Sequence, residues 1–184
     1  MTCEKLFAAV LISIIFTDLK SQVRNPTRTY RRPWDIAKFV SRGQPIWTYK
    51  TTEHTDKSCK VDIVRHASEV FVTFNRSYDY HGQRPNIQML GRFDLTNRAE
   101  IRIGRVGMLP NCVEKMVYMS PDSSCALILV SSLDMRRHYF DLRVKNSSVE
   151  AGPHAYCRRE FCRLRKRGTV LYEPACQRRL RPYN

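Results

Sequence analysis

The sequence predicts an all-β protein, in which eight antiparallel strands form a barrel with a short helix before it and an α-helix packed outside its wall. Three observations lead to this fold class. Apolar and polar residues alternate along Val70–Tyr80, seven further segments of seven to ten residues follow the spacing of an antiparallel meander with turn-forming residues between them, and helical spacing occurs near both ends of the strand region. A chain of 184 residues is expected to form one domain with a single core.

The first residues have the layout of a secretory signal peptide. Lys5 precedes an eleven-residue apolar run that ends at Phe16, and this run is too short to span a membrane. A buried N-terminal helix is the alternative. We expect residues 1–21 to be removed, although the sequence leaves the cleaved bond open. Residues 22–33 then form a basic N-terminal extension, and residues 34–184 form the single domain, including the C-terminal helix and a basic tail.

A short helix is expected over Trp34–Val40, where Ile36, Phe39 and Val40 lie on one side and Gly43 ends the segment. The eight strands follow at Pro45–Thr52, Cys59–His66, Val70–Tyr80, Asn86–Leu95, Ala99–Val106, Val113–Met119, Cys125–Ser131 and Arg137–Lys145. Turn chemistry such as Leu109-Pro110-Asn111 separates them. Eight strands of this length can close into a barrel whose interior is filled or holds one small ligand.

The third segment, Val70–Tyr80, shows the alternation best, with Phe74 and Tyr78 on its apolar face. Arg76 is the misfit there, since it either ends the buried part or reaches into a cavity. Asn75 falls on the polar face and begins the triplet Asn75-Arg76-Ser77, which fits the acceptor pattern for N-glycosylation, as does Asn146-Ser147-Ser148. The sequence therefore predicts glycans at Asn75 and Asn146.

The late helix is expected between Pro153, which suits a first turn, and Gly168, which suits a C-terminal cap. At 100° per residue, Cys157, Phe161 and Leu164 form one apolar stripe, and basic residues occupy the other positions. The stretch from Cys157 to Arg181 carries nine Arg and Lys residues, and the whole chain has a net charge of +15. Such a surface favours polyanions such as heparan-type glycans, unless it is only a solvated basic face.

Removal of the signal would leave six cysteines, at positions 59, 112, 125, 157, 162 and 176. In an oxidising compartment an even count predicts three disulfides. Cys157 and Cys162 lie 140° apart on the helix and are therefore not partners. His154, Cys157 and Cys162 could be a zinc half-site, but no second pair has the required spacing. We expect no metal and no cofactor.

Several of these features occur together in one known family. Trp34-Asp35 at the first helix, Trp47-Thr48-Tyr49-Lys50 on the first strand, Cys59 on the second, and Val170-Leu171-Tyr172 before the last cysteine resemble the tick salivary lipocalins of the histamine-binding family. The resemblance implies a lipocalin-type barrel, secreted in saliva, that sequesters a small host mediator, a biogenic amine such as histamine or serotonin or a lipid mediator, in evasion of host defence. It also implies disulfides between Cys59 and Cys176 and between Cys125 and Cys157, which leaves Cys112 with Cys162.

Amine binders of this family resemble a pattern of Cys-Asp-(Val/Ile/Leu), then Glu-Leu-(Trp/Tyr), then Cys. This chain has Cys125-Ala126-Leu127, Asp141-Leu142-Arg143 and Cys157, so Asp141 keeps a carboxylate while Arg143 places a cation where an aromatic residue is usual. The expected ligand-binding residues are Tyr49, Phe74, Tyr78, Tyr139 and Asp141. With Arg76 or Arg143 nearby, a fatty acid or leukotriene carboxylate suits the cavity at least as well as an amine. The alternative is that the aromatic residues simply fill the barrel.

Enzymatic activity is not expected, because the sequence has no G-x-S-x-G, no H-E-x-x-H and no phosphate-binding glycine loop, so no catalytic residue is assigned. The rival hypothesis is an interaction protein whose basic exterior acts on host glycans, clotting or complement. Binding of nucleic acid and a membrane span are not expected.

Overall fold

The structure is a computed structural model that describes residues 34–40, 43–134, 136–164 and 167–180. The chain divides into two units after Arg32, and everything described below belongs to the second unit. The expected signal peptide at 1–21 and the basic extension at 22–33 lie outside the described residues, as do residues 181–184 of the basic tail.

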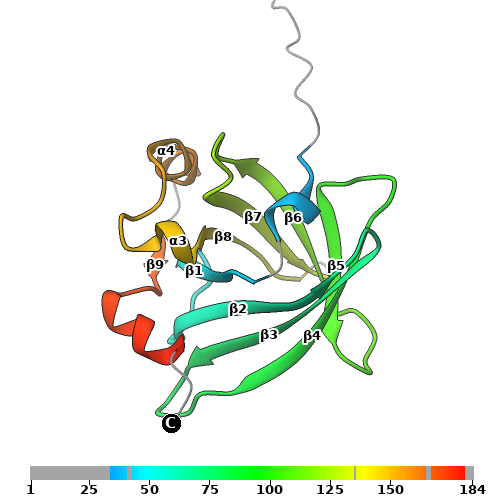
Figure 1. Ribbon diagram of the computed structural model, residues 1–184, viewed down its shortest axis with the longest axis horizontal. Helices are drawn as coiled ribbons and strands as arrows, with labels where there is room; N and C mark the ends of the chain where they lie inside the picture. The colour runs from blue at the N-terminus through cyan, green and yellow to red at the C-terminus, as the bar shows by residue number, and fades with distance from the viewer. Residues whose placement is uncertain (1–33, 41–42, 135, 165–166, 181–184) are drawn as a thin grey trace, which may run out of the picture. The chain divides into compact units, whose positions relative to one another are not determined.

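Eight antiparallel strands close into a barrel (Figure 1), as the alternation pattern predicts. Each strand pairs with the next along the chain, and β1 closes the barrel because it pairs with both β2 and β8. The strand bounds are β1 Pro45–Thr51, β2 Ser58–Ala67, β3 Phe71–Asp79, β4 Asn86–Phe93, β5 Glu100–Arg105, β6 Cys112–Met119, β7 Cys125–Ser132 and β8 His138–Lys145. They agree with the sequence-based bounds to within two residues.

One end of the barrel is closed by the short helix α2, Ile36–Phe39. Asp35 caps this helix because its carboxylate accepts a hydrogen bond from the backbone N–H of Ala37 at 3.1 Å. Ile36 and Phe39 are each 1% exposed and join the apolar core of the barrel interior. We call this end the closed end. The opposite end, formed by the β1–β2, β3–β4, β5–β6 and β7–β8 loops, is called the open end.

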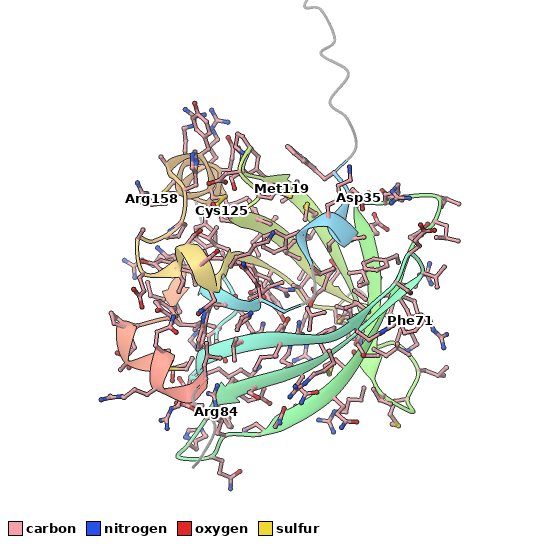
Figure 2. All side chains as sticks on the ribbon, viewed as in Figure 1. Asp35, Phe71, Arg84, Met119, Cys125 and Arg158 are labelled. Carbon is pink, nitrogen blue, oxygen red and sulfur yellow. A yellow bond between two sulfur atoms is a disulfide. The ribbon has the colours of Figure 1, made fainter. Side chains whose placement is uncertain are left out.

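The outer face of the barrel is covered on one side by α3 (Asn146–Val149) and α4 (Ala155–Arg163), as Figure 1 shows. Cys157 and Phe161 on α4 are buried against the barrel wall, and Leu164 packs beside them, which confirms the predicted apolar stripe. A disulfide joins Cys157 to Cys125 on β7, beneath the helix (Figure 2). The strand β7 is therefore buried on both faces.

The C-terminal segment completes the barrel wall between β1 and β2. Only the first part of β1 pairs with β2, and the two-residue strand β9 (Thr169–Val170) pairs with the last part of β1 instead. Leu171 then bridges the seam: its N–H donates to the carbonyl of Tyr49 at 3.0 Å, and its own carbonyl accepts from the N–H of Cys59 at 2.7 Å. A 3-10 helix, η1 (Pro174–Leu180), follows, and its Cys176 is bonded to Cys59. The sequence did not predict β9, α3 or η1.

The third expected disulfide, between Cys112 and Cys162, is wrong, because both thiols are free. Cys112 pairs with Ser132 in the β6–β7 ladder and so lies at the open end, about seven residues, or roughly 23 Å, from Cys125. The helix α4 is fixed at Cys125 through Cys157. Cys162 lies only about 7.5 Å further along that helix, on its exposed side. The two thiols therefore cannot meet.

Candidate functional site: a cavity above a buried charge cluster

A cavity of about 640 Å³ opens at the open end of the barrel. This volume lies within the usual range for small-molecule sites. Side chains from five strands and from the β1–β2, β5–β6 and β7–β8 loops line it: Thr52, Glu53, His54, Lys57, Arg76, Met89, Asn111, Cys112, Val130, Ser132, Arg136, Arg137, His138 and Tyr139. The lining thus combines apolar and aromatic groups deeper in the barrel with charged groups at the entrance.

Below this cavity, six charged side chains meet inside the barrel, and we call them the charge cluster. They point inward from β2, β3, β6 and β8 and are Lys60, Asp62, Arg76, Glu114, Asp141 and Arg143. Three are cations and three are anions, so the charge cluster is neutral as a whole. Full pairing of this kind is what allows ionised groups to remain inside a protein.

Glu114 and Arg143 form the innermost pair of the charge cluster. The Arg143 guanidinium donates two parallel hydrogen bonds to the Glu114 carboxylate, from Nη1 to Oε2 at 2.5 Å and from Nη2 to Oε1 at 2.8 Å. Glu114 is 1% exposed. Burial by itself would raise the pKa of its carboxyl, but the Arg143 and Arg76 guanidiniums outweigh burial and hold that pKa well below its usual range. Glu114 is therefore ionised throughout the neutral range.

Arg76 forms the second bidentate pair. Its Nε and Nη2 donate to the two carboxylate oxygens of Asp62 at 2.8 Å and 2.7 Å, and Nη2 also lies 3.0 Å from Glu114 Oε1. Burial would lower the pKa of Arg76, but the two carboxylates raise it well above its usual value. Of the two alternatives that the sequence left open for Arg76, the structure shows the second: the side chain reaches into the barrel.

Asp141 is fully buried and already has three partners. Its carboxylate accepts from Thr51 Oγ1 at 2.7 Å, Lys60 Nζ at 3.0 Å and Arg143 Nη2 at 3.2 Å. Burial alone would raise the pKa of this carboxyl, but Lys60 and Arg143 hold it below its usual value. Asp141 is expected from the sequence to receive a ligand amine, yet in the structure it balances the protein's own cations.

The charge cluster separates the two halves of the barrel interior. On its far side, toward α2, lies a cavity of only about 20 Å³ lined mainly by apolar side chains such as Phe39, Val72 and Ile103. That space is about enough for one water molecule. Of the space inside the described barrel, the cavity at the open end is therefore the part that can accept a ligand.

The structure brings two of the expected aromatic residues to the open half of the barrel. Tyr139 lines the cavity, and its ring lies 5.9 Å from Lys60 Nζ. Burial, together with the carboxylates of Asp141 and Glu53, raises the pKa of its hydroxyl, so Tyr139 stays a neutral hydrogen-bond donor. Tyr78 is half-buried, with its ring 5.3 Å from Lys57 Nζ. Tyr139 is placed where a bound molecule can contact it, whereas Tyr78 is not among the residues that line the cavity.

The other two expected aromatic residues lie elsewhere. Phe74 is buried on the closed side of the charge cluster and fills the core, with its ring 5.2 Å from the Arg76 guanidinium. Tyr49 lies on the outer face of β1, where its ring stacks on that of Tyr172 at 5.9 Å. The expectation that Tyr49 faces the ligand is wrong. The C-terminal segment covers the outer face of β1, so an apolar side chain can be buried there without pointing into the barrel.

The two glycosylation predictions have different structural settings. Asn75 is a half-buried residue of β3 and pairs with Ile63 and Gln88 on the neighbouring strands. Asn146 begins α3, where its side-chain oxygen accepts from Trp47 Nε1 at 2.7 Å and Gln177 Nε2 at 2.9 Å. The Asn146 side chain thus helps to fix the C-terminal segment on the barrel. Glycosylation at either site stays a prediction.

Positive charge predominates at the entrance of the cavity. Glu53 is the one acid among the described lining residues; it lies 3.4 Å from Lys57, and its Oε2 is buried without a hydrogen-bond partner. In the described part of the chain, Arg137 lies near Asp134 but not within ion-pair distance of it, and Arg136 Nε is 3.9 Å from Asp134. The entrance therefore offers two arginines that no strong internal ion pair engages.

Cys112 also lines the cavity as a free thiol. Burial raises the pKa of this thiol from 9.0 to about 11, which keeps it protonated and weakly nucleophilic at neutral pH. It therefore contributes to the wall as a small apolar side chain rather than as a reactive group.

Comparison with known proteins identifies the architecture. No family model matches the chain, and no curated protein matches it in sequence. Several solved structures are similar to it, including a serotonin complex and a cholesterol complex. The serotonin complex of AM182 aligns with a TM-score of 0.59 at 17% identity, over 79% of this chain and 94% of AM182. Japanin from Rhipicephalus appendiculatus, solved with cholesterol, aligns with a TM-score of 0.54 at 13% identity, over 72% of this chain and 95% of Japanin. The protein therefore has the lipocalin-like fold, an eight-stranded closed barrel with a C-terminal helix, that is seen in tick lipocalins.

Proposed function

We propose that the protein is a secreted carrier whose open-end cavity binds a small amphipathic ligand with an anionic head, such as a fatty acid or a leukotriene-type lipid mediator. The observation that carries this proposal is the arrangement of charge in the barrel. The carboxylates of the charge cluster are engaged by the protein's own cations, whereas Arg136 and Arg137 at the entrance are available to a ligand.

The shape of the site supports the same class of ligand. Met89, Val130 and Tyr139 offer apolar surface inside the cavity for a hydrocarbon chain, and the arginines lie at the entrance. A carboxylate head placed there would accept charge-assisted hydrogen bonds from a guanidinium, which is well suited to pair with a carboxylate. The charge cluster forms a floor that stops the chain from reaching the closed end.

A biogenic amine is the second candidate, and one observation favours it. The Oε2 atom of Glu53 is buried in the cavity wall without a hydrogen-bond partner, and Tyr78 and Tyr139 are aromatic groups in the same half of the barrel. An ammonium group could pair with that oxygen and lie against an aromatic ring. AM182, which was solved with serotonin, shares the fold. Four cations in the cavity lining oppose a cationic ligand, so we place this candidate second.

Displacement of a fluorescent fatty acid tests the proposal. We expect dansyl-undecanoic acid to bind saturably and arachidonate to displace it. Replacing both entrance arginines, Arg136→Ala with Arg137→Ala, should weaken binding at least about tenfold, because each hydrogen bond to a charged group contributes roughly 1.5 to 3 kcal/mol. The matched control removes two exposed arginines from the outer face of the barrel, Arg92→Ala with Arg102→Ala, and should bind the probe like the parent protein.

Serotonin, histamine and cholesterol complete the ligand set. Equal loss of binding in the two arginine pairs, or no saturable binding of the probe, would contradict an anionic ligand. Serotonin binding that is lost in Glu53→Gln but unchanged in the entrance variant would establish the amine instead. The signal-like N-terminus and the disulfides support secretion. Secretion in turn supports the role that the resemblance implies, which is to sequester a host mediator and so evade host defence.

The basic exterior supports a separate interaction with anionic glycans. Arg158 and Arg159 on α4 are exposed, and Arg158 lies on the side of α4 away from the barrel (Figure 2). Within the described residues neither has a carboxylate partner. We expect the protein to bind immobilised heparin and to elute at a clearly lower salt concentration after Arg158→Ala with Arg159→Ala. The pair Arg92→Ala with Arg102→Ala has the same charge change, so an equal shift there would indicate only a net-charge effect.

A further inference from the structure

Four exposed apolar side chains stand on two loops beside the cavity entrance. Residues 106–111 connect β5 to β6, and residues 133–137 connect β7 to β8; we call them the rim loops. The exposed fractions are 50% for Val106, 70% for Met108, 88% for Leu109 and 45% for Leu133. The two loops are neighbours, because the N–H of Leu133 donates to the carbonyl of Asn111 at 3.0 Å.

The longer rim loop is held in a defined conformation. The N–H of Asn111 donates to the Ile103 carbonyl at 2.9 Å, and the N–H of Met108 donates to the Arg105 carbonyl at 3.0 Å. The loop backbone also packs tightly on Gly104, where a Cβ atom would lie 2.7 Å from the Leu109 carbonyl oxygen. An ordered backbone thus holds Met108 and Leu109 in solvent. Exposing neighbouring large apolar side chains to water is unfavourable, and the surfaces of soluble proteins normally avoid it.

Arginines surround these apolar side chains. Arg105 directly precedes one rim loop, and Arg136 and Arg137 lie at the end of the other; all three are exposed. The acid described in these loops is Asp134, so the rim has an excess of two positive charges. Apolar tips flanked by arginines match the two layers of an anionic phospholipid surface, which are the acyl boundary and the charged headgroups.

We propose that the rim loops dock the open end of the barrel onto an anionic phospholipid bilayer. Met108 and Leu109 insert at the boundary between headgroups and acyl chains, and Arg105, Arg136 and Arg137 contact headgroup phosphates. Two narrow loop tips do not offer the roughly 800 Å² per partner of a standard protein interface. Insertion into the outer 5 to 10 Å of a bilayer requires no such area. Among the described residues no helix has the length and apolarity to cross a membrane.

Docking would turn the cavity entrance toward the lipid, because Asn111, Arg136 and Arg137 belong to both the rim loops and the cavity lining. A ligand taken from the bilayer would then enter the barrel without crossing water. That last step rests on the proposed function. The docking itself does not, because Met108 and Leu109 are not part of the cavity lining.

Co-sedimentation with vesicles tests the docking. We expect the protein to bind vesicles of phosphatidylcholine with 30% phosphatidylserine, and to bind at least about tenfold more weakly to pure phosphatidylcholine or in high salt. Met108→Ser with Leu109→Ser should weaken binding at least about tenfold, because each apolar side chain is transferred out of water on insertion. The control is Val70→Ser with Leu95→Ser, an exposed apolar pair in the β2–β3 and β4–β5 loops beside Phe71, which is labelled in Figure 2.

Insertion has its own readout. A Leu109→Trp variant should be quenched by brominated phospholipids, whereas Leu95→Trp should not. No binding to phosphatidylserine vesicles, equal loss in the two serine pairs, or absence of quenching at position 109 would overturn the proposal. So would vesicle binding that depends on Arg158 and Arg159 of α4 rather than on the rim loops. The serine variant of the rim should still bind the fluorescent fatty acid, which separates a failure of docking from a failure of the proposed carrier function.

Discussion

Replacing Glu114 by alanine is expected to lower the free energy of unfolding by about 3 to 5 kcal/mol. Glu114 is buried and contacts two guanidiniums, those of Arg143 and Arg76. Its removal leaves Arg143 with only the single contact to Asp141 at 3.2 Å and a longer one to Asp62 at 3.8 Å. The charge cluster then has an uncompensated positive charge in the barrel interior. Urea unfolding followed by intrinsic tryptophan fluorescence measures the effect.

The matched control is Glu100→Ala. Glu100 also forms a short ion pair, with Lys115 at 2.7 Å, but both side chains are partly exposed. Exposed pairs of this kind contribute up to about 1 kcal/mol, so the control should be close to the parent protein. Similar losses in the two variants would mean that the charge cluster is hydrated in solution and does not hold the barrel together.

The pH dependence of stability provides a second readout of the same groups. The pKa values of Glu114 and Asp141 are lower in the folded protein than the ordinary values near 4 that unfolded chains have. The stabilisation from these carboxylates is therefore fully present above about pH 4 and is lost as the pH falls toward the folded values. We expect the free energy of unfolding to fall below pH 4, with a shallower slope in Glu114→Ala.

Removing the disulfide between Cys59 and Cys176 is the second change with a large expected effect. The bond encloses 117 residues, and loop entropy predicts a loss of about 4 to 5 kcal/mol for Cys59→Ala with Cys176→Ala. The bond between Cys125 and Cys157 encloses 32 residues, so its removal should cost about 1 kcal/mol less. Urea unfolding of both variants without reductant makes the comparison.

The free cysteines supply the control for the disulfide series. Cys112→Ala with Cys162→Ala removes the same two sulfur atoms without opening a bond, and we expect a loss below about 1 kcal/mol because Cys162 is exposed and Cys112 is only half-buried. Mass spectrometry should show two free thiols in the parent protein. A large loss in this control, or no free thiol, would indicate that Cys112 and Cys162 are bonded after all.

The sequence predicted the strands well because period-two alternation in β3 and the turn residues between the segments are local features of the sequence. It also predicted the inward position of Asp141 and the apolar stripe of α4. What it could not assign is which face of a strand is inside. On β2, the apolar Cys59 and Val61 face the C-terminal segment and the charged Lys60 and Asp62 face the barrel interior, the reverse of the usual pattern.

Tyr49 was misplaced for the same reason. A strand that is covered on its outer face has two buried faces. An aromatic residue in its sequence does not indicate whether the side chain packs in the barrel interior or against the segment outside. The charge cluster was missed because its members come from four strands, and only their inward register brings Lys60, Glu114 and Asp141 together. One signal was present: Arg76 interrupts the apolar face of β3, and a charged side chain at an inward position needs a partner of opposite charge from another strand.

The strand β9 also affects how the protein is made. Its residues fill the gap between β1 and β2, and they follow all eight strands of the barrel in the chain. Without β9, β1 and β2 stay paired only over Pro45–Trp47, so the backbone groups of Lys50 and Thr51 lack a partner on that side of the seam. The seam is completed, and Cys59 can bond Cys176, only after these later residues have been synthesised. A chain truncated before Thr169 would leave that edge exposed, and we expect it to aggregate more readily than the parent protein.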